Sequence, residues 1–329
     1  MRRAAPFLLV LTLAACGGHR HPVSVANPCA FPPPPQAASA AAAPTPAALV
    51  TGALEKALAA QDVHVDLRLS LAARYDSRRA RRPQPRSTFP ARRLEVLAAH
   101  PWCLAFSGVR TREGVSGSGV LEQAGMRTPF DLALSHRGFY LRVSGRWTGA
   151  KQFSPAGMFS SESVAGLIPQ AACIRAQSEG CDKVDLHRLV RSGLLGRALT
   201  GRVGRLANGW LLDGTVDSEG LVRLMGTLGD PADYDPYARD GRAVFAVGRD
   251  GLPTLFELRW RLDRAALIEH GGFDALNSPI TSQALHLRIA FSRWEESAPI
   301  RVPSSYAAMS QSFGMRLFLG FEYVLGLYG

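Results

Sequence analysis

Alternation of apolar and polar residues dominates the chain from residue 62 onward. Between 62 and 71 every odd position is apolar and every even position is polar or charged. This period of two is typical of a strand with one buried face. Similar alternation follows at 102–106, 130–134, 139–143, 256–262 and 285–291. The pattern therefore predicts a domain built mostly of strands.

Turn residues join several of these runs into hairpins. HRG at 136–138 separates the runs at 130–134 and 139–143. GRDG at 248–251 separates AVFAV from LPTLFELRWRL. Glycine and aspartate between alternating runs are typical of hairpin connections. A further strand is expected at 210–216.

Two segments have the pattern of helices. Thr45-Pro46 places a capping hydroxyl before a proline at the first helical position, and AALVTGALEKALAAQ follows with apolar residues every three to four positions. Asp182 can cap a second helix through DLHRLVRSGLL. Between the hairpins and this helix, residues 150–181 have the composition of a loop and a broken helix.

The first residues form an export signal. Arg2 and Arg3 precede about ten apolar residues, too few for the roughly 20 that span a bilayer. The segment ends in Leu-Ala-Ala-Cys, which looks like a bacterial lipobox. We therefore expect residues 1–15 to be a lipoprotein signal peptide and Cys16 to carry acyl chains such as palmitate. The alternative is ordinary secretion with Cys16 as a spare thiol.

Composition divides the chain after residue 15 into three regions. The Pro- and Ala-rich stretch 16–45 predicts a lipid-anchored, mobile tether. No Pro/Gly-rich break follows, so a single domain is expected over 46–310. Residues 311–329 form an apolar C-terminal extension, expected to pack on that domain.

Overall composition is that of a globular protein, with 47% hydrophobic and 20% charged residues. It excludes collagen-like, wholly disordered and polytopic membrane proteins. The net charge of +11 would fall to +9 with the loss of Arg2 and Arg3. Such a charge allows attraction to anionic headgroups, with a solvated basic surface as the alternative. The Arg-rich segment 74–93 could bind phosphates or glycolipid headgroups, with a solvated, mobile insertion as the alternative. Export argues against nucleic acid as a partner.

The cysteines suit an oxidising envelope. With Cys16 lipidated, four of the five cysteines remain, an even number. Cys173 with Cys181 is the preferred pair because the two flank a short polar segment, and Cys29 with Cys103 would then pin the tether to the domain. Four unpaired buried thiols are the alternative, and no spacing matches a zinc site.

No catalytic motif stands out. GVSGSG at 114–119 lacks the order of a nucleophile elbow, and neither H-E-x-x-H nor a Walker loop occurs. The acidic loop DPADYDPYARDG does not have EF-hand spacing. We therefore expect no enzyme activity, no metal and no cofactor.

Four segments resemble the LolA-like superfamily and, within it, mycobacterial lipoproteins of the LppX/LprG type. They are ALVTGALEKALAAQDVHVDLRLSL, GFYLRVSGRWTGA, RDGLPTLFELRWRLD and RWEESAPIRVP. In order, they resemble the helix feeding the opening strand, a strand with its Trp turn, a late turn and the closing strand. The resemblance covers most of 46–303, whereas 74–93, 150–181 and the C-terminal extension depart from the compact family form.

The resemblance implies an α+β fold: a strongly curved antiparallel sheet, or half-barrel, with helices covering its concave face. Acyl chains would lie between sheet and helices, where each buried methylene is worth about 0.8 kcal/mol. The candidate lipid-binding residues are Leu67, Leu69, Phe130, Leu132, Leu141, Phe256, Leu258, Trp260 and Leu287. For each, the alternative is an ordinary core position.

The implied function is that of a membrane-anchored lipoprotein on the periplasmic or extracellular side of the cell envelope. It would carry a lipid, glycolipid or other acylated ligand. One alternative is a sensor or accessory lipoprotein that binds an envelope protein. The other is a structural lipoprotein without a ligand.

Overall fold

The architecture comes from a computed structural model. It describes residues 27–76, 78, 101–111, 114–123, 125–135, 138–143, 145–150, 193–216, 241–263, 280–296, 300 and 302–308.

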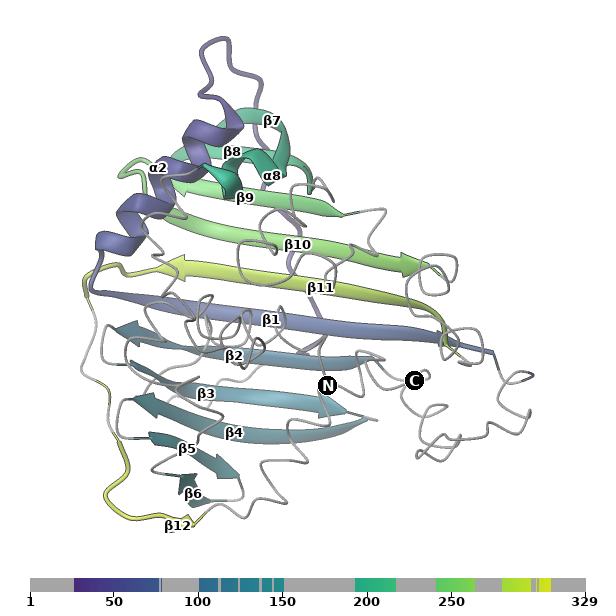
Figure 1. Ribbon diagram of the computed structural model, residues 1–329, viewed down its shortest axis with the longest axis vertical. Coiled ribbons are helices and arrows are strands. Elements are labelled where there is room, and N and C mark those ends of the chain that lie inside the picture. Colours follow the sequence, from purple (N-terminus) through teal and green to yellow (C-terminus); the bar gives the residue numbers. More distant parts are fainter. Residues whose placement is uncertain are drawn as a thin grey trace, which may run out of the picture.

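One sheet of twelve strands makes up most of the described chain (Figure 1). The strands are β1 (Asp62–Tyr75), β2 (Trp102–Thr111), β3 (Gly114–Gln123), β4 (Met126–Ser135), β5 (Gly138–Val143), β6 (Arg146–Ala150), β7 (Leu199–Leu206), β8 (Gly209–Val216), β9 (Arg242–Gly248), β10 (Pro253–Asp263), β11 (Ile280–Ser292) and β12 (Ala307–Ala308). Their order across the sheet is β12-β6-β5-β4-β3-β2-β1-β11-β10-β9-β8-β7. Neighbours are antiparallel except for β12 and β6, which are parallel. The sheet is open, with β12 and β7 as its two edges.

The described helices are α2 (Pro46–Ala59) and α8 (Leu194–Ala198). Both lie at the β7 end of the sheet, and the main strand contacts of α2 are with β7, β9 and β10 (Figure 1). The expected α+β half-barrel, with helices covering its concave face, is therefore wrong, because the fold is a single large open sheet. Size explains the difference. A helix of 14 residues is about 21 Å long, whereas twelve strands about 4.8 Å apart span roughly 53 Å.

The start of α2 matches its sequence signal. Thr45 is extended and its Oγ1 accepts a hydrogen bond from the Ala48 amide at 3.3 Å, with Pro46 in the first turn. The last turn is fixed to the sheet because Lys56 Nζ donates to the carbonyl of Asp250 in the β9–β10 turn. Of the second predicted helix, only the end lies in the described chain, where α8 begins at Leu194.

The predicted hairpins are confirmed. β4 pairs with β5, placing Leu132 opposite Leu141, and β9 pairs with β10, placing Phe245 opposite Phe256. β3 and β7 were not predicted, because GVSGSGVLEQ and LTGRVGRL have too many glycines to show an apolar alternation.

The strand register divides the sheet into two faces. On β1, Leu67 lies opposite Phe106 and Ile289, and these three residues belong to what we call the apolar face. The even positions of β1, beginning with His64, belong to the opposite polar face. The main core lies on the apolar face over β1, β2, β3 and β11. A second cluster joins α2 to β8 and β9 on the same face, through Val50 and Leu212 among others.

Candidate functional site

All nine residues predicted to contact acyl chains belong to the apolar face. Strand pairing carries this face from β5 through β4, β3, β2, β1 and β11 to β10. Sequence periodicity had grouped these residues only within single strands. The pairing brings them together across the sheet.

Burial separates the nine into two groups. The buried residues, at most 4% exposed, are Leu67, Leu69, Leu141 and Leu287. The residues that pack against the core while remaining only partly buried are Phe130, Leu132, Phe256 and Leu258. The first group is core, whereas the second keeps apolar surface that a ligand can cover. Trp260 lies on this face by register, opposite Leu285, and its side chain lies outside the described part of the structure.

Residues beyond the predicted nine share this partly buried state. They are Val109, Leu121, Leu285, Phe291 and Trp294. Phe291 and Leu285 continue the alternation of Leu287 and could have been predicted from it. Trp294 follows β11 in a turn, where no periodicity remains. Its Nε1 donates to the Pro253 carbonyl at 3.1 Å, and its ring lies 5.9 Å from that of Phe291.

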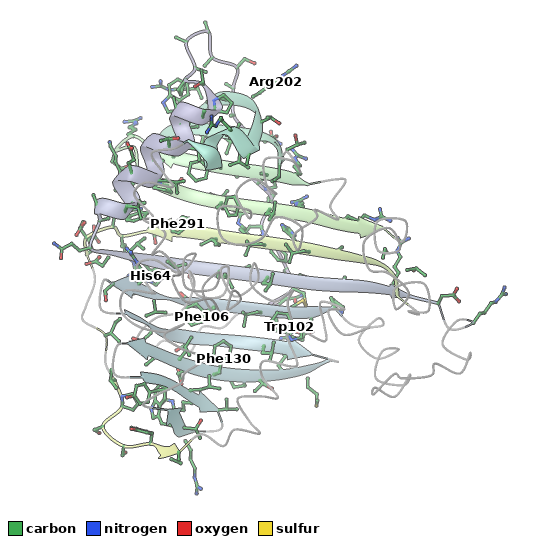
Figure 2. All side chains as sticks on the ribbon, in the orientation of Figure 1. His64, Trp102, Phe106, Phe130, Arg202 and Phe291 are labelled. Carbon is green, nitrogen blue, oxygen red and sulfur yellow. A yellow bond between two sulfur atoms is a disulfide. The ribbon has the colours of Figure 1, made fainter. Side chains whose placement is uncertain are left out.

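The glycines of β3 leave room for aromatic rings on this face. Gly119 lies opposite both Phe106 and Phe130, whose ring centroids are 6.2 Å apart (Figure 2). A Cβ at Gly119 would lie 2.5 Å from Phe130 Cζ and 2.7 Å from the Ala105 carbonyl oxygen. GVSGSG therefore forms the part of a strand over which the Phe130 ring lies.

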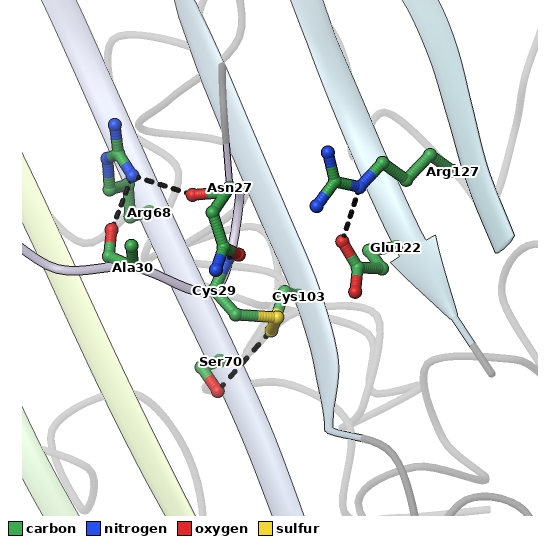
Figure 3. The surroundings of a disulfide bond; sticks show 8 residues. All are labelled: Asn27, Cys29, Ala30, Arg68, Ser70, Cys103, Glu122 and Arg127. Atoms are coloured by element: carbon green, nitrogen blue, oxygen red, sulfur yellow. Dashed lines mark hydrogen bonds and ion pairs between the residues drawn. A yellow bond between two sulfur atoms is a disulfide. The ribbon is translucent and has the colours of Figure 1, made fainter. Parts of the chain in front are cut away.

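On the polar face, the segment 27–38 forms a strap without regular secondary structure (Figure 3). A disulfide joins Cys29 to Cys103 of β2, with the two Cα atoms 5.2 Å apart. Arg68 Nη1 donates to the carbonyl of Asn27 at 3.1 Å and also to that of Ala30. The beginning of the strap is thus fixed across β1 and β2.

The rest of the strap continues to the edge strand β7. Phe31 stacks on His286 with ring centroids 3.6 Å apart, and Arg288 Nη1 donates to the Pro32 carbonyl at 2.9 Å. Ala38 then forms a backbone bridge with Arg205. Residues 27–38 therefore lie on the sheet rather than in a mobile tether. Because backbone carbonyls hold the strap to Arg68 and Arg288, its path over the sheet leaves no pattern of apolar residues in the sequence.

A buried carboxylate lies where the strap crosses β10 and β11. Glu257 is 1% exposed. Its Oε1 accepts from Arg259 Nη2 at 2.8 Å and lies 2.9 Å from His286 Nε2, and its Oε2 accepts from Arg288 Nη1 at 2.8 Å. Burial alone would raise the pKa of Glu257, but hydrogen bonds from His286 and Arg259 outweigh it and lower that pKa. The pKa of His286 is lowered, chiefly by burial and against the attraction of Glu257.

A second polar contact joins β1 to β2. His64 Nε2 lies 3.2 Å from Ser107 Oγ and 3.6 Å from Asp66 Oδ1. Burial would raise the pKa of Asp66, but hydrogen bonds to His64 and Ser107 lower it overall. In a catalytic triad the serine and the carboxylate bind different ring nitrogens, whereas here both approach Nε2. Local sequence patterns do not reveal this contact, because it joins residues of two neighbouring strands.

The part of the chain described here contains no group of three or more His, Cys, Asp or Glu residues that could hold a metal ion. None of its helices is long and apolar enough to span a membrane. Three predicted positions, Cys16, Cys173 and Cys181, lie outside the described residues, as do most of the Arg-rich segment and the C-terminal extension.

Comparisons with known proteins are sparse. No family model matches the chain. No curated protein matches it. Among solved structures, it is similar to the crystal structure of LprF from Mycobacterium bovis, at a TM-score of 0.30 and 13% identity over 80% of this chain and 100% of that chain. This weak likeness establishes neither a family nor a ligand.

Proposed function

We propose that this protein is a lipid-anchored envelope lipoprotein that binds acyl chains on the apolar face of its sheet. The anchor is the acylated Cys16 of the Leu-Ala-Ala-Cys segment. The ligand is a lipid, a glycolipid or an acylated protein, carried within the cell envelope. A sensor that binds an envelope protein, or a lipoprotein without ligand, is the competing function.

One observation carries the proposal. The apolar face continues over neighbouring strands from β5 to β10, and several of its large side chains are only partly buried. Phe130 and Leu132 on β4 and Phe256 and Leu258 on β10 lie on either side of the fully buried centre formed by β1 and its neighbours. A surface of this kind suits a long, flexible, apolar ligand.

The energetics suit acyl chains rather than polar ligands. Each methylene moved from water onto such a surface is worth about 0.8 kcal/mol, so a chain of ten methylenes gains about 8 kcal/mol before the cost of ordering it. No polar group is needed for that gain, and selectivity among acyl chains would be weak.

The test is uptake of a fluorescent fatty acid by the purified protein and by matched variants. Leu132→Ala and Leu258→Ala each remove about 1.4 kcal/mol or more of apolar contact, and each should weaken uptake about tenfold. The control is Leu206→Ala, because Leu206 is also partly buried but lies on the polar face of β7, on the same side as Arg202. Equal affinity in all three variants would contradict the proposal and favour a partner-binding or structural lipoprotein.

A further inference from the structure

Arginines gather on the polar face over β1 and β7–β11. Strand pairing aligns Arg202 with Asp213, Glu257, Arg288 and Arg68 in one row across the sheet. The arginine patch, as we call it, comprises Arg68, Arg74, Arg202, Arg242, Arg259, Arg261 and Arg288.

Acidic residues balance the arginine patch only in part. The acids on the same rows are Asp213, Glu257 and Asp263, which leaves seven positive against three negative charges. Asp66 borders the patch in the next row. Counting that residue as well, the region retains three positive charges in excess.

Three arginines of the patch are exposed and available to a ligand. Arg288 and Arg259 pair with Glu257, and Arg242 pairs with Asp213 at 2.7 Å. Arg74, Arg202 and Arg261, in contrast, have no ion-pair partner among the described residues, and all three are exposed. Guanidinium groups of this kind bind phosphate oxygens through paired hydrogen bonds.

The course of the strap relates the patch to the membrane. The described chain begins at Asn27, which is on the polar face because its carbonyl accepts from Arg68. Cys16 precedes it by eleven residues, a reach of at most about 40 Å when fully extended. An acyl anchor at Cys16 therefore holds Asn27, at the start of the strap on the polar face, within this distance of the bilayer.

We propose that the polar face docks on an anionic bilayer, with lipid phosphates held by Arg74, Arg202 and Arg261. The anchor part of this inference depends on the proposed lipidation of Cys16, while the arginine patch does not. In this orientation the apolar face, on the other side of the sheet, is directed away from the bilayer. Ligand binding and membrane docking then use opposite faces and do not compete.

The experiment is vesicle flotation of the chain from residue 16 onward with Cys16→Ser, so that neither the apolar signal peptide nor an acyl anchor contributes. Vesicles containing phosphatidylglycerol are compared with vesicles of phosphatidylcholine alone. The test variants are Arg74→Gln and Arg261→Gln, singly and together. The control is Arg146→Gln, because Arg146 is also exposed but lies on the apolar face of β6, opposite Val143.

Binding should favour the anionic vesicles and decline with added salt. Each test substitution should lower the partition coefficient about fivefold, and the double variant about 25-fold, at the usual worth of about 1 kcal/mol per basic residue near an anionic surface. Arg146→Gln should leave it unchanged. Equal binding to both kinds of vesicle, or an equal loss in Arg146→Gln, would overturn the docking proposal. Fatty acid uptake is measured separately, so a failure there would reject acyl-chain binding without affecting this result.

Discussion

Replacing Glu257 by glutamine tests how much the buried carboxylate on the polar face stabilises the protein, because the substitution keeps the side-chain volume and removes the charge. Three cationic or hydrogen-bonding groups then lose their carboxylate partner. Arg288 matters most, since its side chain is only 14% exposed and its Nη1 lies 2.8 Å from Glu257 Oε2. Without the carboxylate this guanidinium remains largely buried, with no other carboxylate paired to it among the described residues.

The size of the effect follows from exposure. A charge-assisted hydrogen bond in a buried setting is worth about 1.5–3 kcal/mol, which applies to Arg288. Arg259 is 45% exposed, so water screens its pair and its share is below about 1 kcal/mol. We therefore expect Glu257→Gln to lower the free energy of unfolding by about 3 kcal/mol. The control Glu122→Gln breaks a pair with Arg127, itself 49% exposed, and should cost below about 1 kcal/mol.

The assay is urea unfolding followed by tryptophan fluorescence, repeated across pH. Because the folded-state pKa of Glu257 is lowered from 4.5, its stabilisation is complete above about that pH and is lost as the pH falls through the lowered value. The difference between wild type and Glu257→Gln should therefore shrink in acid. A loss no larger than that of Glu122→Gln at neutral pH would refute the reasoning.

Three further predictions concern the strap and the apolar face. Gly119→Ala should destabilise the protein by about 1–3 kcal/mol, because the added Cβ would lie 2.5 Å from a carbon of the Phe130 ring and 2.7 Å from the Ala105 carbonyl oxygen. The control Gly52→Ala, whose Cβ would have nothing within 4 Å, should not destabilise the protein. Urea unfolding midpoints measure both effects. The double variant Cys29→Ser with Cys103→Ser removes the disulfide that links residues 74 positions apart. Its free energy of unfolding, measured by urea titration without reductant, should be lower by about 4 kcal/mol. A loss below about 1 kcal/mol would mean that the disulfide adds little stability. The folded-state pKa of His286 is lowered from 6.5, so the contribution of neutral His286 to stability is lost as the pH falls below about that value. The free energy of unfolding of His286→Gln should therefore depend less steeply on pH than that of wild type. The same pH dependence in both proteins would contradict this role of His286.

Local patterns predicted the strands and α2 because they depend on neighbours in sequence. The alternation at 62–71 and the Thr45-Pro46 signal were sufficient for β1 and α2. The same alternation predicted which side chains of β10 share a face. Local patterns could not predict the order of the strands in the sheet, because the pairing of β1 with β11 joins residues more than 200 positions apart. The predicted helical cover was inferred from a resemblance, and the described helices are too short to provide it.

The candidate site was predictable only strand by strand. Periodicity found Leu67 and Leu258 as apolar positions, but only the register shows that they belong to one face. A disulfide from Cys29 to Cys103 was expected from the sequence. The course of the strap across the sheet was not predictable, since its hydrogen bonds to the sheet are made by backbone carbonyls that accept from Arg68 and Arg288. The burial of Glu257 was not predictable either, because Glu257 and the exposed Arg261 occupy equivalent polar positions in the alternation along β10.

The measurement that tests the central proposal most directly is mass spectrometry of the protein purified from a bacterial envelope, under native and then denaturing conditions. Acyl-chain binding predicts an added mass of lipid size in the native spectrum, lost after extraction with organic solvent and restored by an added fatty acid. A native mass equal to that of the polypeptide with its covalent acyl anchor, together with no uptake of a fluorescent fatty acid, would contradict the proposal.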